Sequence, residues 1–101
     1  MADGLANAIK ALAAGRSLEI AETEDAFGVI VHGDATPTQI AALLASLRVK
    51  GETPDEVAGA ARALRHVMRR FDAVSPETLV DTCGTGGGTI ATFNISTASA
   101  F

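Results

Sequence analysis

The sequence predicts a mainly α-helical chain. A small four-helix N-terminal domain over residues 1–72 is expected to precede the first strand, a glycine-rich loop and the helix start of an incomplete, truncated α/β domain over residues 73–101. Three observations predict this class. Apolar residues recur at helical spacing through the first 70 residues. Proline and glycine stand where helices usually begin and end, and a β-branched run with clustered glycines then replaces the helical pattern.

The composition limits the classes of protein. A chain of 101 residues with 48% hydrophobic residues has room for about one small domain and is too apolar for a disordered tail. Its net charge of −4 argues against a nucleic-acid partner. No run approaches the roughly 20 apolar residues of a membrane-spanning helix, so we expect no membrane association. A single cysteine, Cys83, excludes an internal disulfide and fits a reducing, cytoplasmic location.

Two helices, residues 3–14 and 19–32, are expected in the first third of the chain. Gly15 and Gly33 follow them as C-terminal stops. The N-terminus of the second helix carries no clear capping signal. Each helix has one apolar side, formed by Leu5, Ile9 and Leu12 in the first and by Ile20, Phe27, Ile30 and Val31 in the second.

Two further helices share a stronger signal, a capping box with proline at the first helical position. It occurs in Thr36-Pro37-Thr38-Gln39 and again in Thr53-Pro54-Asp55-Glu56. Gly51 ends the first of these two helices. Their apolar stripes consist of Ile40, Leu43, Leu44 and Leu47, and of Val57, Ala60, Ala61, Leu64 and Met68. Four short helices joined by short loops predict a compact bundle.

The pattern changes after Phe71. Thr78–Cys83 is a short β-branched, apolar run, which predicts a strand with Cys83 as a small buried residue at its end. A helix is expected to open at Asn94, the candidate N-cap.

Four glycines within residues 84–88 indicate a place where the backbone closely approaches another molecule. Successive N–H groups and the start of the following helix favour an anion such as phosphate. A solvated glycine loop without a ligand is the alternative. The segment matches neither the Walker loop nor the glycine pattern of dinucleotide-binding folds.

These segments resemble a known family. Asp81-Thr82-Cys83-Gly84-Thr85-Gly86-Gly87, with Thr92-Phe93-Asn94-Ile95-Ser96-Thr97, is similar to the phosphoribosyl-diphosphate loop of anthranilate phosphoribosyltransferases. Residues 33–40 and 47–53 resemble helix junctions of that family's small helical domain. The resemblance covers nearly the whole chain but about the first third of such an enzyme. Because the chain stops inside an apolar helix start, we expect it to be a partial chain.

The resemblance implies a substrate site for phosphoribosyl diphosphate and anthranilate, one ligand of the cofactor Mg²⁺, and no catalytic residue in this chain. Ser96 is the implied magnesium ligand. The helical domain is the implied homodimer contact. Gly88 departs from the family, which usually has aspartate there, so any carboxylate role at that position is lost or moved. The implied substrate-binding residues are Gly84, Gly87, Gly88, Thr92, Asn94, Ile95, Ser96 and Thr97.

The expected function is therefore that of the N-terminal portion of a phosphoribosyltransferase of tryptophan biosynthesis, inactive alone because its donor site is incomplete. Two alternatives remain open. One is a helical homodimerisation or interaction module without catalysis. The other is a pyrimidine nucleoside phosphorylase-like homologue, although residues 81–87 lack the lysine and histidine of the phosphorylase loop.

Overall fold

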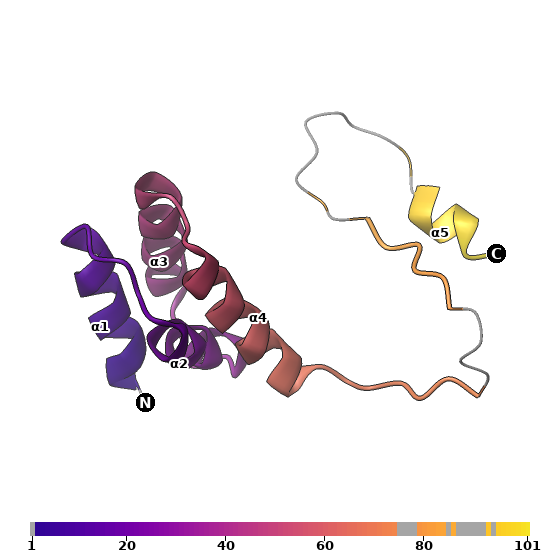
Figure 1. The fold of residues 1–101 in the computed structure, drawn as a ribbon, viewed down its shortest axis with the longest axis horizontal. Coiled ribbons are helices and arrows are strands. Elements are labelled where there is room, and N and C mark those ends of the chain that lie inside the picture. Colours follow the sequence, from indigo (N-terminus) through magenta and orange to yellow (C-terminus); the bar gives the residue numbers. More distant parts are fainter. Residues whose placement is uncertain (1, 75–78, 85, 87–92, 94) are drawn as a thin grey trace. The chain divides into compact units, whose positions relative to one another are not determined.

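The computed structural model describes residues 2–74, 79–84, 86, 93 and 95–101. The chain divides into two compact units, Met1–Arg70 and Phe71–Phe101. The four predicted helices are confirmed in the first unit, and a short helix lies in the second (Figure 1). No helix in the described part of the chain is long and apolar enough to cross a membrane. The helices are α1 (Ala2–Ala13), α2 (Ile20–Val31), α3 (Pro37–Lys50), α4 (Pro54–Val67) and α5 (Ile95–Ser99).

The core of the helical unit lies where α1 contacts α2 and α3, and α2 extends the packing to α4. Leu5 and Leu43 are completely buried at its centre. Small residues fill much of the remaining space, so the helices can approach one another closely. The buried apolar residues are Leu5, Ala8, Leu12, Leu18, Ala26, Leu43, Leu47 and Ala63.

The contact between α2 and α4 depends on a glycine. A Cβ added to Gly59 would lie 2.5 Å from the carbonyl oxygen of Ile20 and 2.7 Å from the Cβ of Thr23. Thr23 is fully buried, and its hydroxyl donates a hydrogen bond of 3.0 Å to the carbonyl oxygen of Glu19. The buried face of α2 is therefore formed by Thr23 and Ala26. The apolar side expected from the sequence is only partly buried: Ile20, Phe27, Ile30 and Val31.

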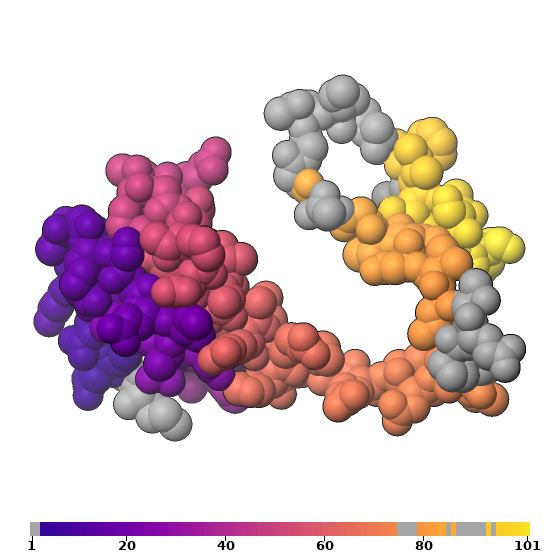
Figure 2. All heavy atoms as spheres, viewed as in Figure 1, coloured from indigo at the N-terminus to yellow at the C-terminus, as the bar shows by residue number. Residues whose placement is uncertain are grey.

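The apolar stripe of α4 also differs from a core-facing stripe. Val57, Leu64 and Met68 are 58%, 54% and 49% exposed. The face of α4 that is buried carries Glu56, Gly59 and Ala63 instead. The close approach to α2 at Gly59 fixes this orientation, because a larger residue there would push the helices apart. Atoms of α4 lie at the surface of this unit along the helix (Figure 2).

The start of α2 is held by an ion pair that the sequence analysis did not detect. The carboxylate of Glu22 accepts two hydrogen bonds from Arg16, at 2.8 and 2.9 Å, and one of 2.9 Å from the backbone N–H of Glu19. The bidentate contact joins the α1–α2 loop to the first turn of α2. Glu22, in the first turn of α2, therefore accepts the backbone N–H of the N-cap residue Glu19, and Arg16 of the preceding loop holds the Glu22 carboxylate in place.

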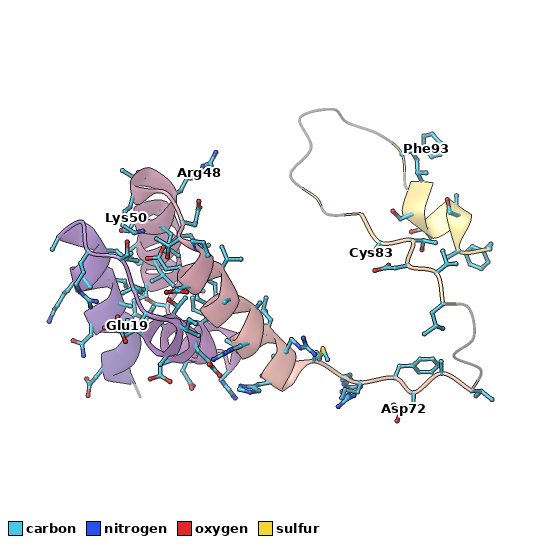
Figure 3. All side chains as sticks on the ribbon, in the orientation of Figure 1. Glu19, Arg48, Lys50, Asp72, Cys83 and Phe93 are labelled. Carbon is cyan, nitrogen blue, oxygen red and sulfur yellow. The ribbon has the colours of Figure 1, made fainter. Side chains whose placement is uncertain are left out.

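A buried carboxylate joins three parts of the helical unit. Glu56, which is 2% exposed, accepts a hydrogen bond of 2.8 Å from Leu18 N–H in the α1–α2 loop. It also accepts one of 2.8 Å from Thr53 N–H at the start of α4 and one of 2.9 Å from Lys50 Nζ at the end of α3. Glu56, the last residue of the α4 capping box, therefore also fixes the α1–α2 loop and α3. Figure 3 shows Arg48, on the same helix as Lys50, pointing away from the bundle.

The second unit corrects two expectations. The predicted strand Thr78–Cys83 does not form over its described part, residues 79–83. A β-strand needs a neighbour to complete its backbone hydrogen bonds, and the described residues supply none. Cys83 is exposed, not buried as expected. The expected helix is present as α5, although its candidate N-cap Asn94 lies outside the described residues.

Candidate functional site

The glycine-rich segment is entered through a turn fixed by an aspartate. The Oδ1 atom of Asp81 accepts a hydrogen bond of 2.7 Å from the backbone N–H of Cys83. An aspartate that accepts from the N–H two residues later forms a local turn that mimics a backbone turn. Figure 3 marks Cys83 in this segment. The turn ends directly before Gly84, the first of the predicted substrate-binding residues.

Gly84 lies beside Ser96 of α5. A Cβ added to Gly84 would be 3.6 Å from Ser96 Oγ, which is ordinary van der Waals contact. Ser96 is half-buried, whereas Gly84 is exposed. The hydroxyl of Ser96 therefore lies next to the backbone of Gly84, twelve residues earlier in the sequence.

The remaining predicted residues fall into two groups. Ile95 and Thr97 flank Ser96 in the first turn of α5 and are exposed. The other predicted residues lie outside the described part of the chain: Gly87, Gly88, Thr92 and Asn94. Gly86 adopts φ +71°, a conformation that favours glycine. The described part of the candidate site thus consists of one glycine backbone and three residues of α5.

The donor atoms near this segment suit only a sparsely held metal ion. No group of three or more His, Cys, Asp or Glu side chains within the described ranges is placed to hold a metal. Ser96 supplies a hard hydroxyl oxygen. Mg²⁺ prefers oxygen ligands, takes few of them from protein and completes its shell with water or substrate phosphates. One hydroxyl is therefore compatible with Mg²⁺ held mainly by a phosphorylated ligand.

Positive charge for a phosphorylated ligand is scarce in this part of the sequence. Arg70 is the last basic residue of the chain. Backbone N–H groups, a metal ion or groups of another segment must therefore offset the charge of a bound diphosphate.

The helical unit carries an apolar groove of about 340 Å³ between α3 and α4. Leu44, Val57 and Leu64 line it and are about half exposed. Its other lining residues are Phe27, Leu47, Glu52, Glu56, Ala60 and Ala61. Exposed apolar side chains gathered in one groove are typical of a contact surface.

A second hollow, of about 470 Å³, lies between α1, α2 and α4. Titratable side chains surround it, and His66 Nδ1 lies 3.3 Å from the Oε1 atom of Glu24. His66 is 72% exposed, as expected for a solvated helix face. Among the residues that the structure describes, these side chains form no group of three or more that is placed to hold a metal ion.

Comparisons with known proteins agree with the resemblance. The chain is 50% identical over 92 residues to the anthranilate phosphoribosyltransferase of Acidithiobacillus ferrooxidans, which covers 91% of this chain and 27% of that protein. It is 50% identical over 95 residues to the anthranilate phosphoribosyltransferase of Pelotomaculum thermopropionicum, and this match covers 94% of this chain and 27% of that protein. The anthranilate phosphoribosyltransferase of a Chelativorans species is 46% identical over 101 residues, and this match covers 100% of this chain and 29% of that protein. No solved structure matches the chain.

The chain therefore spans little more than a quarter of the length of these curated relatives. A family model described as the helical bundle domain of a glycosyl transferase family matches residues 6–68, which include most of α1 and all of α2, α3 and α4. Because this match covers more than half of the chain, the protein belongs to that glycosyl transferase family.

Proposed function

We propose that this chain forms part of an anthranilate phosphoribosyltransferase, which transfers phosphoribose from phosphoribosyl diphosphate to anthranilate and releases diphosphate. The observation that carries this proposal is the identity of 46–50% to enzymes of that name over at least 91% of the chain. The proximity of Gly84 and Ser96 supports it, because both belong to the segment predicted to hold the donor.

In this reaction the bond between ribose C1 and diphosphate breaks, and the amine nitrogen of anthranilate forms a new bond to C1. The transition state resembles an oxocarbenium ion, as in glycoside hydrolysis, so stabilising the departing anion is the main task. We assign the glycine backbone from Gly84 to Gly88 to contact with the diphosphate. Ser96 would hold Mg²⁺, which supplies positive charge to the leaving group when bound.

We expect the 101-residue chain to be inactive alone, since the relatives are more than three times as long. The test is a chimera in which residues 1–101 replace the corresponding segment of the Acidithiobacillus enzyme. Phosphoribosyl diphosphate, Mg²⁺ and anthranilate are supplied, and both anthranilate consumption and diphosphate release are measured. We expect the chimera to be active and the isolated chain to show no turnover.

Two glycine variants sharpen this test. Gly84→Val places a branched side chain against Ser96, so we expect it to abolish activity in the chimera. Gly28→Ala is the matched control, because nothing lies within 4 Å of the added Cβ. A folded chimera that consumes no anthranilate would contradict the proposal, and phosphate-dependent cleavage of a pyrimidine nucleoside would favour the phosphorylase alternative.

We also propose that the helical unit serves as a homodimer contact. The groove between α3 and α4 supports this, because Leu44, Val57 and Leu64 are too exposed to contribute fully to a monomer core. Another exposed apolar residue, Val49, is 88% exposed and lines a different hollow, between α1 and α3. The groove between α3 and α4 and the hollow between α1 and α3 are therefore two alternative faces for the homodimer contact.

Light scattering after size-exclusion chromatography tests the dimer and its face. Leu64→Asp changes the groove, and Val49→Asp changes the α1–α3 side. We expect the unchanged chain to be dimeric and one of the two variants to be monomeric. A chain that stays monomeric at every concentration tested would contradict the proposal.

A further inference from the structure

We propose that Asp81 is a positioning residue of the candidate site, which holds the backbone at Cys83 so that Gly84 lies beside Ser96. This inference rests on the proposed function, because it assigns Asp81 a role in binding the phosphorylated donor. The resemblance assigned no role to Asp81. Its contact lies one residue before the predicted site and involves no predicted site residue.

The first step of the argument is the hydrogen bond itself. Its length of 2.7 Å lies at the short end of the range for an N–H donor and a carboxylate oxygen. A charged acceptor gives a stronger hydrogen bond than a neutral one. The contact closes a turn of three residues, so it restricts the backbone between Asp81 and Cys83.

The second step is the connection to Ser96. Cys83 and Gly84 share a peptide group, so a displaced Cys83 also displaces Gly84. An added Cβ on Gly84 would contact Ser96 Oγ at 3.6 Å, which shows how closely the two segments approach. Asp81 therefore acts on the spacing between the glycine backbone and the Ser96 hydroxyl through the backbone of Cys83.

The third step concerns competition for the carboxylate. The sequence has no lysine or arginine after Arg70. No basic side chain of residues 71–101 can therefore draw Asp81 away from the N–H of Cys83. A neutral acceptor of the same shape can keep this contact, and this property separates positioning from a need for negative charge.

The first experiment measures the contact in the 101-residue chain. The ¹H and ¹⁵N resonances of the Cys83 amide are compared in the unchanged chain, Asp81→Ala and Asp81→Asn. We expect the chemical shifts of the Cys83 amide to change more in Asp81→Ala than those of any amide before residue 79. In Asp81→Asn they should stay close to the values of the unchanged chain. Asp72→Ala is the matched control and should leave the Cys83 amide unmoved.

The second experiment measures the role in the active chimera. We expect Asp81→Ala to raise the KM for phosphoribosyl diphosphate about tenfold, the factor that corresponds to about 1.4 kcal/mol. Asp81→Asn should stay within about threefold of the unchanged protein, because its amide oxygen can still accept the N–H. A purely structural defect would instead lower the amount of active protein and leave KM unchanged.

The outcomes separate this inference from the proposed function. An unmoved Cys83 amide in Asp81→Ala, or an unchanged KM in an active chimera, overturns the role of Asp81 alone. Equal damage by Asp81→Asn and Asp81→Ala overturns positioning, because it would indicate a requirement for charge. A folded chimera that is inactive with Asp81 in place overturns the proposed function, and the role of Asp81 in donor binding with it.

Discussion

Glu56 and Lys50 form an ion pair inside the helical unit, with 2.9 Å between Oε2 and Nζ and with 1% and 12% of their side chains exposed. The same carboxylate accepts the N–H groups of Leu18 and Thr53. Burial of an ion pair is favourable only when the remaining hydrogen-bonding positions are also satisfied. The Glu56 carboxylate is satisfied by these three donors, and in accepting from them it connects the α1–α2 loop, α3 and α4.

Removing the charge of Glu56 should therefore destabilise the bundle. We expect Glu56→Gln to lower the free energy of unfolding by about 3 kcal/mol, because Lys50 loses its negatively charged partner and an amide oxygen cannot accept from all three donors. Urea denaturation followed by circular dichroism at 222 nm measures the change. Glu52→Gln is the matched control at an exposed position, where we expect a change below about 0.5 kcal/mol. Equal stability of the two variants would contradict the structural role of Glu56.

Two carboxylates should make the helical unit less stable in acid. Burial raises the pKa of Glu56, but hydrogen bonds from Leu18 N–H, Thr53 N–H and Lys50 outweigh this effect, and the net pKa lies below the ordinary 4.5. Hydrogen bonds from Arg16 and from the N–H of Glu19 lower the pKa of Glu22 from 4.5 to about 2. Both groups therefore bind protons more readily in the unfolded chain.

The resulting stabilisation is fully present above the unfolded pKa of 4.5 and declines as the pH falls, towards about 2 for Glu22. Urea midpoints measured between pH 7 and pH 2 should be flat above about pH 5.5 and fall below it. Glu22→Gln should reduce the stability that is lost between about pH 5.5 and pH 2. The reduction should be no more than about 1 kcal/mol, because the pair with Arg16 is exposed. A midpoint that rises on acidification would contradict the assignment of both groups.

Except for the start of α2, the helix boundaries could be predicted because their signals are local. Thr36 accepts the N–H of Gln39, and Thr53 accepts that of Glu56, as the two capping boxes predict. Gly15, Gly33 and Gly51 all have positive φ at or just beyond the helix ends. Each signal needs only residues within one helical turn, so no knowledge of the tertiary structure is required.

The buried faces of α2 and α4 could not be predicted in the same way. Hydrophobicity marks the stripe of Val57 and Leu64, but Gly59 determines which side of α4 meets α2. A glycine adds nothing to an apolar stripe, so its effect on packing is visible only when both helices are placed. The Arg16–Glu22 pair was missed because it crosses from a loop into a helix.

The candidate site shows the same division. The turn from Asp81 to Cys83 spans three residues and lies within reach of local sequence rules. The approach of Gly84 to Ser96 spans twelve residues in sequence; the order of glycine loop and helix start indicated a shared anion site, and the family resemblance named both residues as part of it. The strand expected at Thr78–Cys83 depends on a partner strand, which local propensity cannot supply.

Exposed and buried leucines of the bundle should respond differently to truncation. Leu43 is completely buried, so we expect Leu43→Ala to lower the free energy of unfolding by about 2–5 kcal/mol. Leu64 is 54% exposed, so Leu64→Ala should lower it by less than about 1 kcal/mol in the monomer. Both are measured by urea denaturation at a concentration where the chain is monomeric. Similar losses for the two variants would mean that the apolar stripe of α4 is buried after all.

Two helix-interior glycines should respond in opposite directions to the same substitution. Gly59→Ala places a methyl group 2.5 Å from the carbonyl oxygen of Ile20, so α2 and α4 must separate and we expect a loss of about 1–3 kcal/mol. Gly28→Ala meets no atom within 4 Å and should stabilise α2 by about 0.5–1 kcal/mol, the ordinary difference in helix propensity. Thermal and urea unfolding of the two variants measure both effects. Because the two substitutions add the same methyl group and remove the same backbone freedom, their difference isolates the helix contact. Stabilisation by Gly59→Ala would show that α2 and α4 do not meet at this residue.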